Sequence, residues 1–235
     1  MHGDLKRLEG LELDGIVAPP SLNNTQDTSH PCTLVLLHGY GANAGDLLGL
    51  RDEIDPTMAC VALQAPVDLG PMGMPGGRAW FQLQMTPEGD ITYDTAGAMS
   101  ALRMLERVVP QAAEQATSEG NASQIVVLGF SQGAMLGHGL LLKSSVELAG
   151  LAACSGRLVP EIFDQRPLDV PAGLPVFLSH GSLDEVIPVA SGHAIKDAYQ
   201  SDSSACVTWV ESPIGHGISP DMLDALRTWF GSFSR

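Results

Sequence analysis

Residues 124–143 read QIVVLGFSQGAMLGHGLLLK, and the pattern of this segment is the strongest indication of the fold. A short apolar run at 125–128 is typical of a buried strand, and the Ala-, Leu- and Met-rich segment after residue 133 favours a helix. Between them, residues 129–133 (GFSQG) have the Gly-x-Ser-x-Gly pattern of a sharp strand-to-helix turn. A serine on such a turn has strained backbone angles, and Cβ atoms two residues to either side would clash. We therefore expect the Ser131 hydroxyl to stand above the edge of a sheet.

Strand-like and helix-like segments alternate along the rest of the chain. Apolar runs predict buried strands at 33–37, 60–63, 150–153, 176–178 and 205–210. Helical spacing predicts helices at 46–54, 94–119, 189–199 and from Ser219 onward, with Pro110 kinking or splitting the second of these. This alternation favours an α/β fold: a mostly parallel central sheet with helices on both faces.

The length of 235 residues fits one α/β domain over 1–235. Within it, residues 1–31 are interpreted as an N-terminal hairpin turning at Asp14-Gly15 and a polar surface loop, and residues 32–235 as the catalytic core. Two longer excursions, at 67–92 and 157–174, are too short to build a separate lid domain.

The charge of the chain excludes some partners. Its 27 acidic and 12 basic residues give a net charge of −15, which repels phosphate backbones and anionic lipid surfaces. We therefore expect neither nucleic-acid binding nor stable membrane association, and a homodimer is left open. The first residues contain no apolar signal-peptide core, and no run approaches 18 apolar residues, which predicts a cytoplasmic protein.

The four cysteines predict neither a disulfide framework nor a metal site. Cys32, Cys60, Cys154 and Cys206 lie in or beside apolar runs, where reduced cysteine behaves as a small hydrophobe. They show no CxxC spacing and no Cys/His ligand pattern. We accordingly expect no metal and no cofactor.

A catalytic serine needs a histidine base that is itself oriented by an acid. In the α/β-hydrolase topology the acid and then the histidine follow the serine in the chain. His216 lies between glycines just after a predicted strand, whereas His193 lies within a helical pattern, so His216 is the favoured base. Asp184 follows another predicted strand by a tight turn and is the favoured acid. The other acids weighed for this role are Asp164, Asp169 and Glu185.

The negative oxygen of a tetrahedral intermediate needs hydrogen-bond donors, and backbone N–H groups provide them without reorganisation. One donor is expected from Gln132, the residue after the serine. The second is expected from the loop after the strand at 33–37, at the Tyr40 amide. A simple strand-to-loop turn at the glycines around Tyr40 is the competing interpretation.

At these positions the chain resembles the phospholipase/carboxylesterase family, which includes acyl-protein thioesterases and small bacterial carboxylesterases. The resemblance runs from about residue 33 to the C-terminus. It rests on four motifs in order: LLHGYG at 36–41, GFSQG at 129–133, HGSLDEVIP at 180–188 and GHGI at 215–218. It implies an α/β-hydrolase fold and a Ser/Asp/His hydrolase without metal or cofactor. It also implies that residues 76–81 (GGRAWF) border the acyl pocket.

The apolar side chains of the 67–92 excursion are predicted to line a substrate groove, with ordinary core packing as the alternative. The residues concerned are Met72, Met74, Trp80 and Phe81. The family commonly has Leu where this chain has Tyr40, and the added bulk predicts a preference for short to medium acyl chains.

Together these features predict a hydrolase of carboxylic esters, or of thioesters, that acts through a Ser131 acyl-enzyme on a small-molecule substrate. The competing interpretations are an acyl-protein thioesterase or lysophospholipase acting on longer chains, and a peptidase or lactonase. A non-catalytic binding protein on the same scaffold is a further one.

Overall fold

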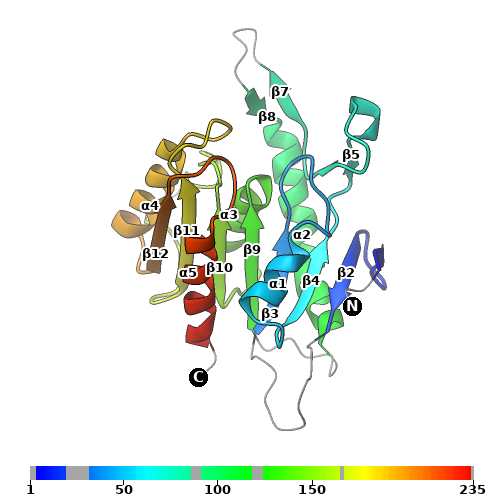
Figure 1. The fold of residues 1–235 in the computed structure, drawn as a ribbon, viewed down its shortest axis with the longest axis horizontal. Helices are drawn as coiled ribbons and strands as arrows, with labels where there is room; N and C mark the ends of the chain where they lie inside the picture. The colour runs from blue at the N-terminus through cyan, green and yellow to red at the C-terminus, as the bar shows by residue number, and fades with distance from the viewer. Residues whose placement is uncertain (1–3, 20–31, 86–90, 118–123, 165–166, 234–235) are drawn as a thin grey trace.

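The computed structural model describes residues 4–19, 32–85, 91–117, 124–164 and 167–233 and builds them around one eight-stranded sheet (Figure 1). The strand order is β1-β2-β4-β3-β9-β10-β11-β12, with the last six parallel and the first two antiparallel to their neighbours. The strands are β1 (Lys6–Arg7), β2 (Asp14–Ala18), β3 (Cys32–Leu37), β4 (Ala59–Leu63), β9 (Gln124–Phe130), β10 (Gly150–Cys154), β11 (Pro175–Gly181) and β12 (Cys206–Ser212). The prediction of a mostly parallel sheet is confirmed.

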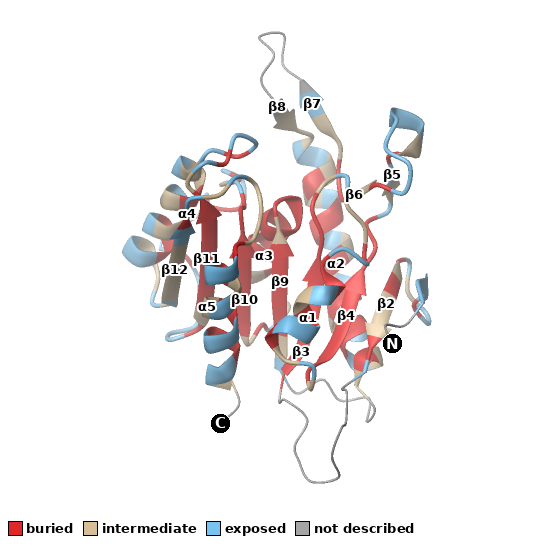
Figure 2. Cartoon of the chain, in the orientation of Figure 1, coloured by how far each residue is buried: buried red, intermediate tan, exposed pale blue. Residues whose placement is uncertain are grey.

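Helices cover both faces of this sheet, as the sequence predicts. On one face lie α1 (Leu48–Ile54) and α5 (Pro220–Phe230), whose apolar residues pack with Leu34 and Leu36 of β3. On the other lie α2 (Thr95–Ala116), α3 (Gln132–Lys143) and α4 (Val189–Asp202). Helices α2 and α3 pack against β3, whose Val35 and Leu37 belong to the buried cluster of this face, and α4 packs against β11 and β12. Successive residues of a strand point to opposite faces, so a strand covered on both faces must be apolar throughout. Figure 2 shows these central strands fully buried.

The register brings the carboxyl ends of the central strands to one edge of the sheet. Leu37 at the end of β3 pairs with Gly129 of β9, and Cys154 at the end of β10 pairs with both Phe130 and Ser179. Residues just beyond these ends therefore lie close together in space, although they come from distant parts of the chain.

Two local predictions are corrected. The N-terminal hairpin exists as β1 and β2, but its turn spans residues 8–13, and Asp14-Gly15 lies within β2. Leu8 and Leu13 are both buried, and burying this pair sets the register. The predicted surface loop at 19–31 lies outside the described residues except for residue 19. Helix α2 runs unbroken from Thr95 to Ala116, so Pro110 does not split it, and buried alanine and valine side chains lie on both sides of the proline.

The start of α5 follows its sequence signal. The Ser219 hydroxyl accepts a hydrogen bond from the Met222 backbone N–H, and Pro220 occupies the first helical position. A single 3₁₀ turn, η2 (Gly231–Phe233), continues the chain beyond α5.

The excursion between β4 and α2 contains short elements that the sequence did not reveal. They are β5 (Val67–Asp68), η1 (Gly70–Met72), β6 (Arg78–Ala79), β7 (Leu83–Met85) and β8 (Ile91–Tyr93). Strands β5 and β6 pair with each other, as do β7 and β8, and neither pair joins the main sheet. Figure 1 shows the β7–β8 ribbon projecting beyond the edge of the sheet where the strands end. Within the described residues, no helix is long and apolar enough to cross a membrane.

Candidate active site

Ser131 lies on a strained turn between β9 and α3. Its backbone has φ +54° and ψ −113°, a conformation that costs free energy in any residue with a side chain. A Cβ atom on Gly129 would lie 2.4 Å from the Gly133 carbonyl oxygen, and one on Gly133 would lie 2.0 Å from the Leu37 carbonyl oxygen. Both positions therefore require glycine, because the neighbouring backbone leaves no room for a Cβ atom, as the motif suggests.

The turn places Ser131 at the wall of a cavity of about 300 Å³. The Ser131 N–H donates to the Cys154 carbonyl at 2.9 Å, which ties the turn to the end of the neighbouring strand. The cavity is lined by Tyr40, Leu83, Thr92, Tyr93, Ser131, Gln132, Met135, Arg157, Val186, Ile187 and His216. The predicted nucleophile, base and oxyanion-loop residues thus share one cavity.

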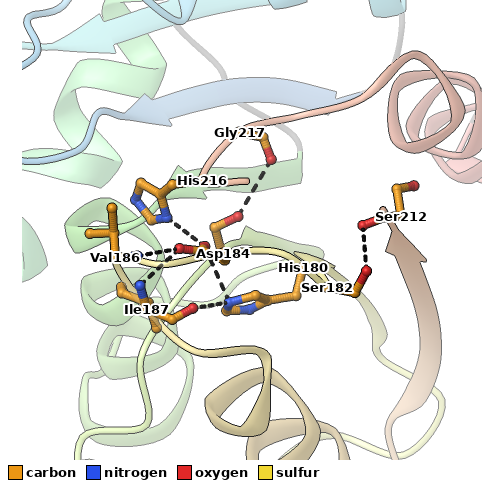
Figure 3. Close-up of polar contacts among 9 residues, drawn as sticks. His180, Ser182, Asp184, Val186, Ile187, Ser212, His216 and Gly217 are labelled. Atoms are coloured by element: carbon orange, nitrogen blue, oxygen red, sulfur yellow. Dashed lines mark hydrogen bonds and ion pairs between the residues drawn. The ribbon is translucent and has the colours of Figure 1, made fainter. Parts of the chain in front are cut away.

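The predicted acid and base are in direct contact. His216 Nδ1 lies 2.6 Å from Asp184 Oδ2 (Figure 3). An ionised carboxylate only accepts hydrogen bonds, so Nδ1 carries the proton and Nε2 is left to accept one. The Phe130 ring packs against the imidazole with ring centroids 4.9 Å apart. This is the arrangement that a general base requires.

Asp184 is held as an anion. Its Oδ1 accepts the backbone N–H groups of Val186 and Ile187 at 2.9 and 2.8 Å. Burial alone would raise the pKa of Asp184, but the hydrogen bonds from His216 and from these two amides outweigh it and lower the pKa below its usual value. The side chain of His180 lies beneath it and donates from Nε2 to the Ile187 carbonyl at 2.8 Å, which holds the turn closed.

The loops that bear Asp184 and His216 are pressed together. The Leu183 N–H donates to the Ile214 carbonyl at 3.0 Å, and the Ser182 N–H donates to the Ser212 carbonyl at 2.8 Å. A Cβ atom on Gly181 would lie only 2.2 Å from the Gly215 carbonyl oxygen. These contacts leave the two loops little freedom to separate.

A second serine supports the histidine loop. Ser155 follows β10, is fully buried and, like Ser131, has a positive φ, of +51°. Its N–H donates to the Ser179 carbonyl at 2.8 Å, and its hydroxyl lies 3.5 Å from the carbonyl oxygen of Gly217. No local sequence pattern indicates this role for Ser155.

The residues that competed for the roles of acid and base lie elsewhere. His193 is on α4, where its Nε2 lies 2.7 Å from Glu211 Oε2 at the surface. Asp164 pairs with Lys143, and Asp169 is exposed. Neither of these aspartates is among the residues that line the cavity.

Both expected oxyanion donors are at the cavity. Gln132 is the first residue of α3, so its backbone N–H has no acceptor within the helix. Tyr40 follows Gly39, and a Cβ atom on Gly39 would lie 3.3 Å from Ser131 Cβ, so the loop lies against the serine.

The side chain of Gln132 has a second role that the sequence did not indicate. Its Oε1 accepts the Trp80 backbone N–H, and its Nε2 donates to the Phe81 carbonyl, both at 2.8 Å. The Trp80 indole N–H in turn donates to the His38 carbonyl at 2.8 Å. Residues 78–81 therefore brace the turn that carries Ser131 against the loop that carries Tyr40.

The four side chains predicted to contact substrate do not line this cavity. Trp80 and Phe81 are each only 2% exposed and belong to the core, because the bonds to Gln132 draw their backbone inward. Met72 and Met74 are 56% and 44% exposed on the outer part of the excursion. The residues of this part of the chain that do line the cavity come from the β7–β8 ribbon: Leu83, Thr92 and Tyr93.

The part of the chain that the structure describes contains no cluster of three His, Cys, Asp or Glu side chains able to hold a metal ion. None of the four cysteines forms a disulfide, and burial raises the pKa of the Cys32 and Cys60 thiols to about 12.

A mostly parallel sheet with a strained serine between β9 and α3, and an Asp–His pair at the ends of later strands, defines an α/β-hydrolase. Comparison with known proteins identifies the branch. The pattern of the phospholipase/carboxylesterase family matches residues 22–232, and the chain belongs to that family.

Relatives share much of the chain. Acyl-protein thioesterase 1 of Saccharomyces cerevisiae is 29% identical over 64% of this chain and 66% of the yeast protein. Its counterpart in Eremothecium gossypii is 32% identical over 81% of this chain and 83% of its own length. Esterase PE8, whose crystal structure is known, is 30% identical in sequence to this chain. The match covers 95% of this chain and 100% of the esterase, and the two structures superpose with a TM-score of 0.74. This chain is accordingly a hydrolase of the ester and thioester class and not a non-catalytic binding protein with the same fold.

Proposed function

We propose that the protein cleaves carboxylic esters of short to medium acyl chains through a Ser131 acyl-enzyme. The observation that carries the proposal is the 2.6 Å contact between His216 and Asp184 at a cavity that Ser131 also lines. In the reaction His216 removes the proton of the Ser131 hydroxyl, and the oxygen attacks the ester carbonyl. The amides of Tyr40 and Gln132 stabilise the negative oxygen of the tetrahedral intermediate. The alcohol leaves with the proton from His216, and water then releases the acid by the same route.

The size and lining of the cavity support short to medium chains. Its volume is about 300 Å³. A methylene group is similar in size to a water molecule, which takes about 30 Å³ of liquid, so roughly ten such groups fill the cavity. Leu83, Met135, Val186 and Ile187 give it apolar walls, and Tyr40 adds bulk at the oxyanion loop.

Thioesters are a second candidate substrate, favoured by the relatives named acyl-protein thioesterases. The same acyl-enzyme serves both, because only the leaving group differs. Longer acyl chains would have to extend beyond the cavity past Val186, whose side chain is 62% exposed. A cytoplasmic location, no nucleic-acid binding, no stable membrane association and a possible homodimer remain expectations from the sequence.

The test combines labelling with a substrate panel. A fluorophosphonate probe should label the wild-type protein and not Ser131→Ala. Nitrophenyl esters and matched acyl-CoA thioesters of 2 to 16 carbons should then show an optimum at the shorter chains, about ten-fold or more over the longest. Tyr40→Leu should move the optimum to longer chains. An optimum at long chains that Tyr40→Leu leaves in place contradicts the chain-length proposal, and labelling of Ser131→Ala contradicts the choice of nucleophile.

A further inference from the structure

The loop that supplies the Tyr40 amide carries an imidazole, that of His38, to which the proposed reaction gives no task. His38 directly follows β3, and its side chain is buried. Both of its ring nitrogens have backbone partners. Nδ1 lies 2.8 Å from the Gly39 carbonyl oxygen, and Nε2 lies 3.1 Å from the backbone nitrogen of Ala65.

These partners fix the protonation of the ring. The Ala65 N–H can only donate, so Nε2 must accept and carries no proton. The Gly39 carbonyl can only accept, so the proton is on Nδ1. Burial lowers the pKa of His38, against smaller opposing effects of the Gly39 bond and of Asp46, which keeps the ring in this neutral form.

The bond to Gly39 acts on the peptide group that carries the expected oxyanion donor. The Gly39 carbonyl and the Tyr40 N–H belong to one planar trans peptide, in which they point in opposite directions. Holding the carbonyl oxygen therefore fixes the direction of the N–H. The Ala42 N–H also donates to this oxygen, at 3.3 Å, and Gly41 has φ +81°, as in a type II turn over 39–42.

From this geometry we propose that His38 is a positioning residue of the oxyanion hole: its Nδ1–H holds the Gly39–Tyr40 peptide so that the Tyr40 N–H faces the developing oxyanion. The inference rests on the proposed function. Donors that need not reorient during the reaction stabilise the intermediate most, which is what this bond provides. The same bond polarises the peptide and strengthens its N–H as a donor. His38 is itself held by the Trp80 indole, which donates to its carbonyl oxygen.

A purely structural role is the alternative. His38 could serve only to satisfy the buried Ala65 N–H and so connect the ends of β3 and β4. The two ring nitrogens separate these roles, since Nε2 makes the structural bond and Nδ1 the positioning bond. Two substitutions can therefore remove one bond at a time.

The experiment compares His38→Asn with His38→Gln. The asparagine amide nitrogen takes about the place of Nδ1 and can still donate to Gly39. The glutamine side chain reaches the place of Nε2, where its oxygen can accept the Ala65 N–H, but it leaves Gly39 without its donor. Steady-state rates on nitrophenyl butyrate would be measured with the inhibition constants of an alkyl trifluoromethyl ketone, which forms a tetrahedral adduct on Ser131, and of butyrate.

Loss of a whole oxyanion donor costs about 10²–10³ in kcat, so a misdirected donor should cost roughly 10-fold or more. His38→Gln should lose about that factor in kcat and in affinity for the ketone, with KM and butyrate affinity unchanged. His38→Asn should stay within about three-fold of the wild type in kcat and ketone affinity. Equal losses in both variants, or unchanged ketone affinity in His38→Gln, would overturn the proposal.

Two further measurements keep the result interpretable. Wild type and Ser131→Ala, assayed first, test the proposed function by themselves, so its failure is not confused with that of His38. Should either variant fail to fold, nitrogen NMR of the wild-type histidines at neutral pH decides the matter, since the proposal requires the Nδ1–H tautomer at His38. A proton on Nε2 overturns it.

Discussion

Ser131 and the Asp184–His216 pair meet at one cavity but are held there by different means. The serine is fixed by its neighbours in the chain: Gly129 and Gly133 allow the backbone contacts that strain it. Asp184 and His216 are 32 residues apart and are fixed by bonds between two separate loops. The nucleophile half of the site, Ser131, is thus encoded within residues 129–133. The acid–base half, Asp184 and His216, forms only when β11 and β12 lie side by side. The turn that carries Ser131 should tolerate few substitutions at its own residues. The geometry of Asp184 and His216 should depend on the bonds between their two loops.

The largest loss of kcat should come from removing either Ser131 or His216, the two residues that join the nucleophile to the acid–base pair. Ser131→Ala and His216→Ala should each lower kcat by a factor on the order of 10⁶, and the double variant should be little worse, because the residues act as a unit. Burst and steady-state kinetics on nitrophenyl butyrate measure this. Losses that add on a logarithmic scale would mean that the two are not partners.

Within the acid–base half, Asp184→Asn should lower kcat by about 10⁴ while the fold is retained, because an amide at this position favours the wrong tautomer of His216. The matched control is Asp169→Asn, an exposed aspartate away from the cavity, which should keep wild-type rates. The assignment of the acid fails if the two variants exchange these results.

Replacing one glycine in each half by alanine compares how much free energy of unfolding each half loses. Gly133→Ala puts a Cβ atom 2.0 Å from the Leu37 carbonyl oxygen, and Gly217→Ala puts one 3.9 Å from its nearest neighbour, Ile214 Cδ1. Urea unfolding should show a loss of about 3 kcal/mol or more for Gly133→Ala and less than about 1 kcal/mol for Gly217→Ala. A loss below about 1 kcal/mol in Gly133→Ala would show that the turn around Ser131 can relax, and a loss of about 3 kcal/mol in Gly217→Ala would show that the histidine loop is as constrained as that turn.

The smallest effect concerns Ser155. Its hydroxyl contact with Gly217 is long, at 3.5 Å, so Ser155→Ala and Ser155→Gly should each lower kcat by less than about ten-fold. The two should differ in stability, because glycine adopts φ +51° without strain and alanine does not. Glycine should be the more stable by about 1 kcal/mol. A loss of kcat near that of Asp184→Asn would make Ser155 as important as the acid.

The same contrast explains what the sequence could predict. The strand–turn–helix around Ser131 is local, and its residues could be assigned one by one. Asp184 and His216 could be selected because their order and strand-end positions are topological signals. The contacts that complete the site leave no such local signal. The bonds from the Gln132 side chain to Trp80 and Phe81 join segments about fifty residues apart. The sequence therefore predicts Trp80 in the substrate groove, whereas the structure buries it beside the turn that carries Ser131.

The β7–β8 ribbon gives the cavity an outer wall that is not part of the main sheet. Leu83, Thr92 and Tyr93 reach the cavity from two strands that pair only with each other. Changes at these three positions therefore leave the hydrogen bonds of the main sheet intact, in contrast to changes at Gly129 and Gly133 beside Ser131. A directed-evolution library confined to this ribbon should yield altered acyl selectivity with a high fraction of folded clones. Substitutions in the β7–β8 ribbon can therefore change which substrates bind, while the residues that carry out the chemistry stay the same.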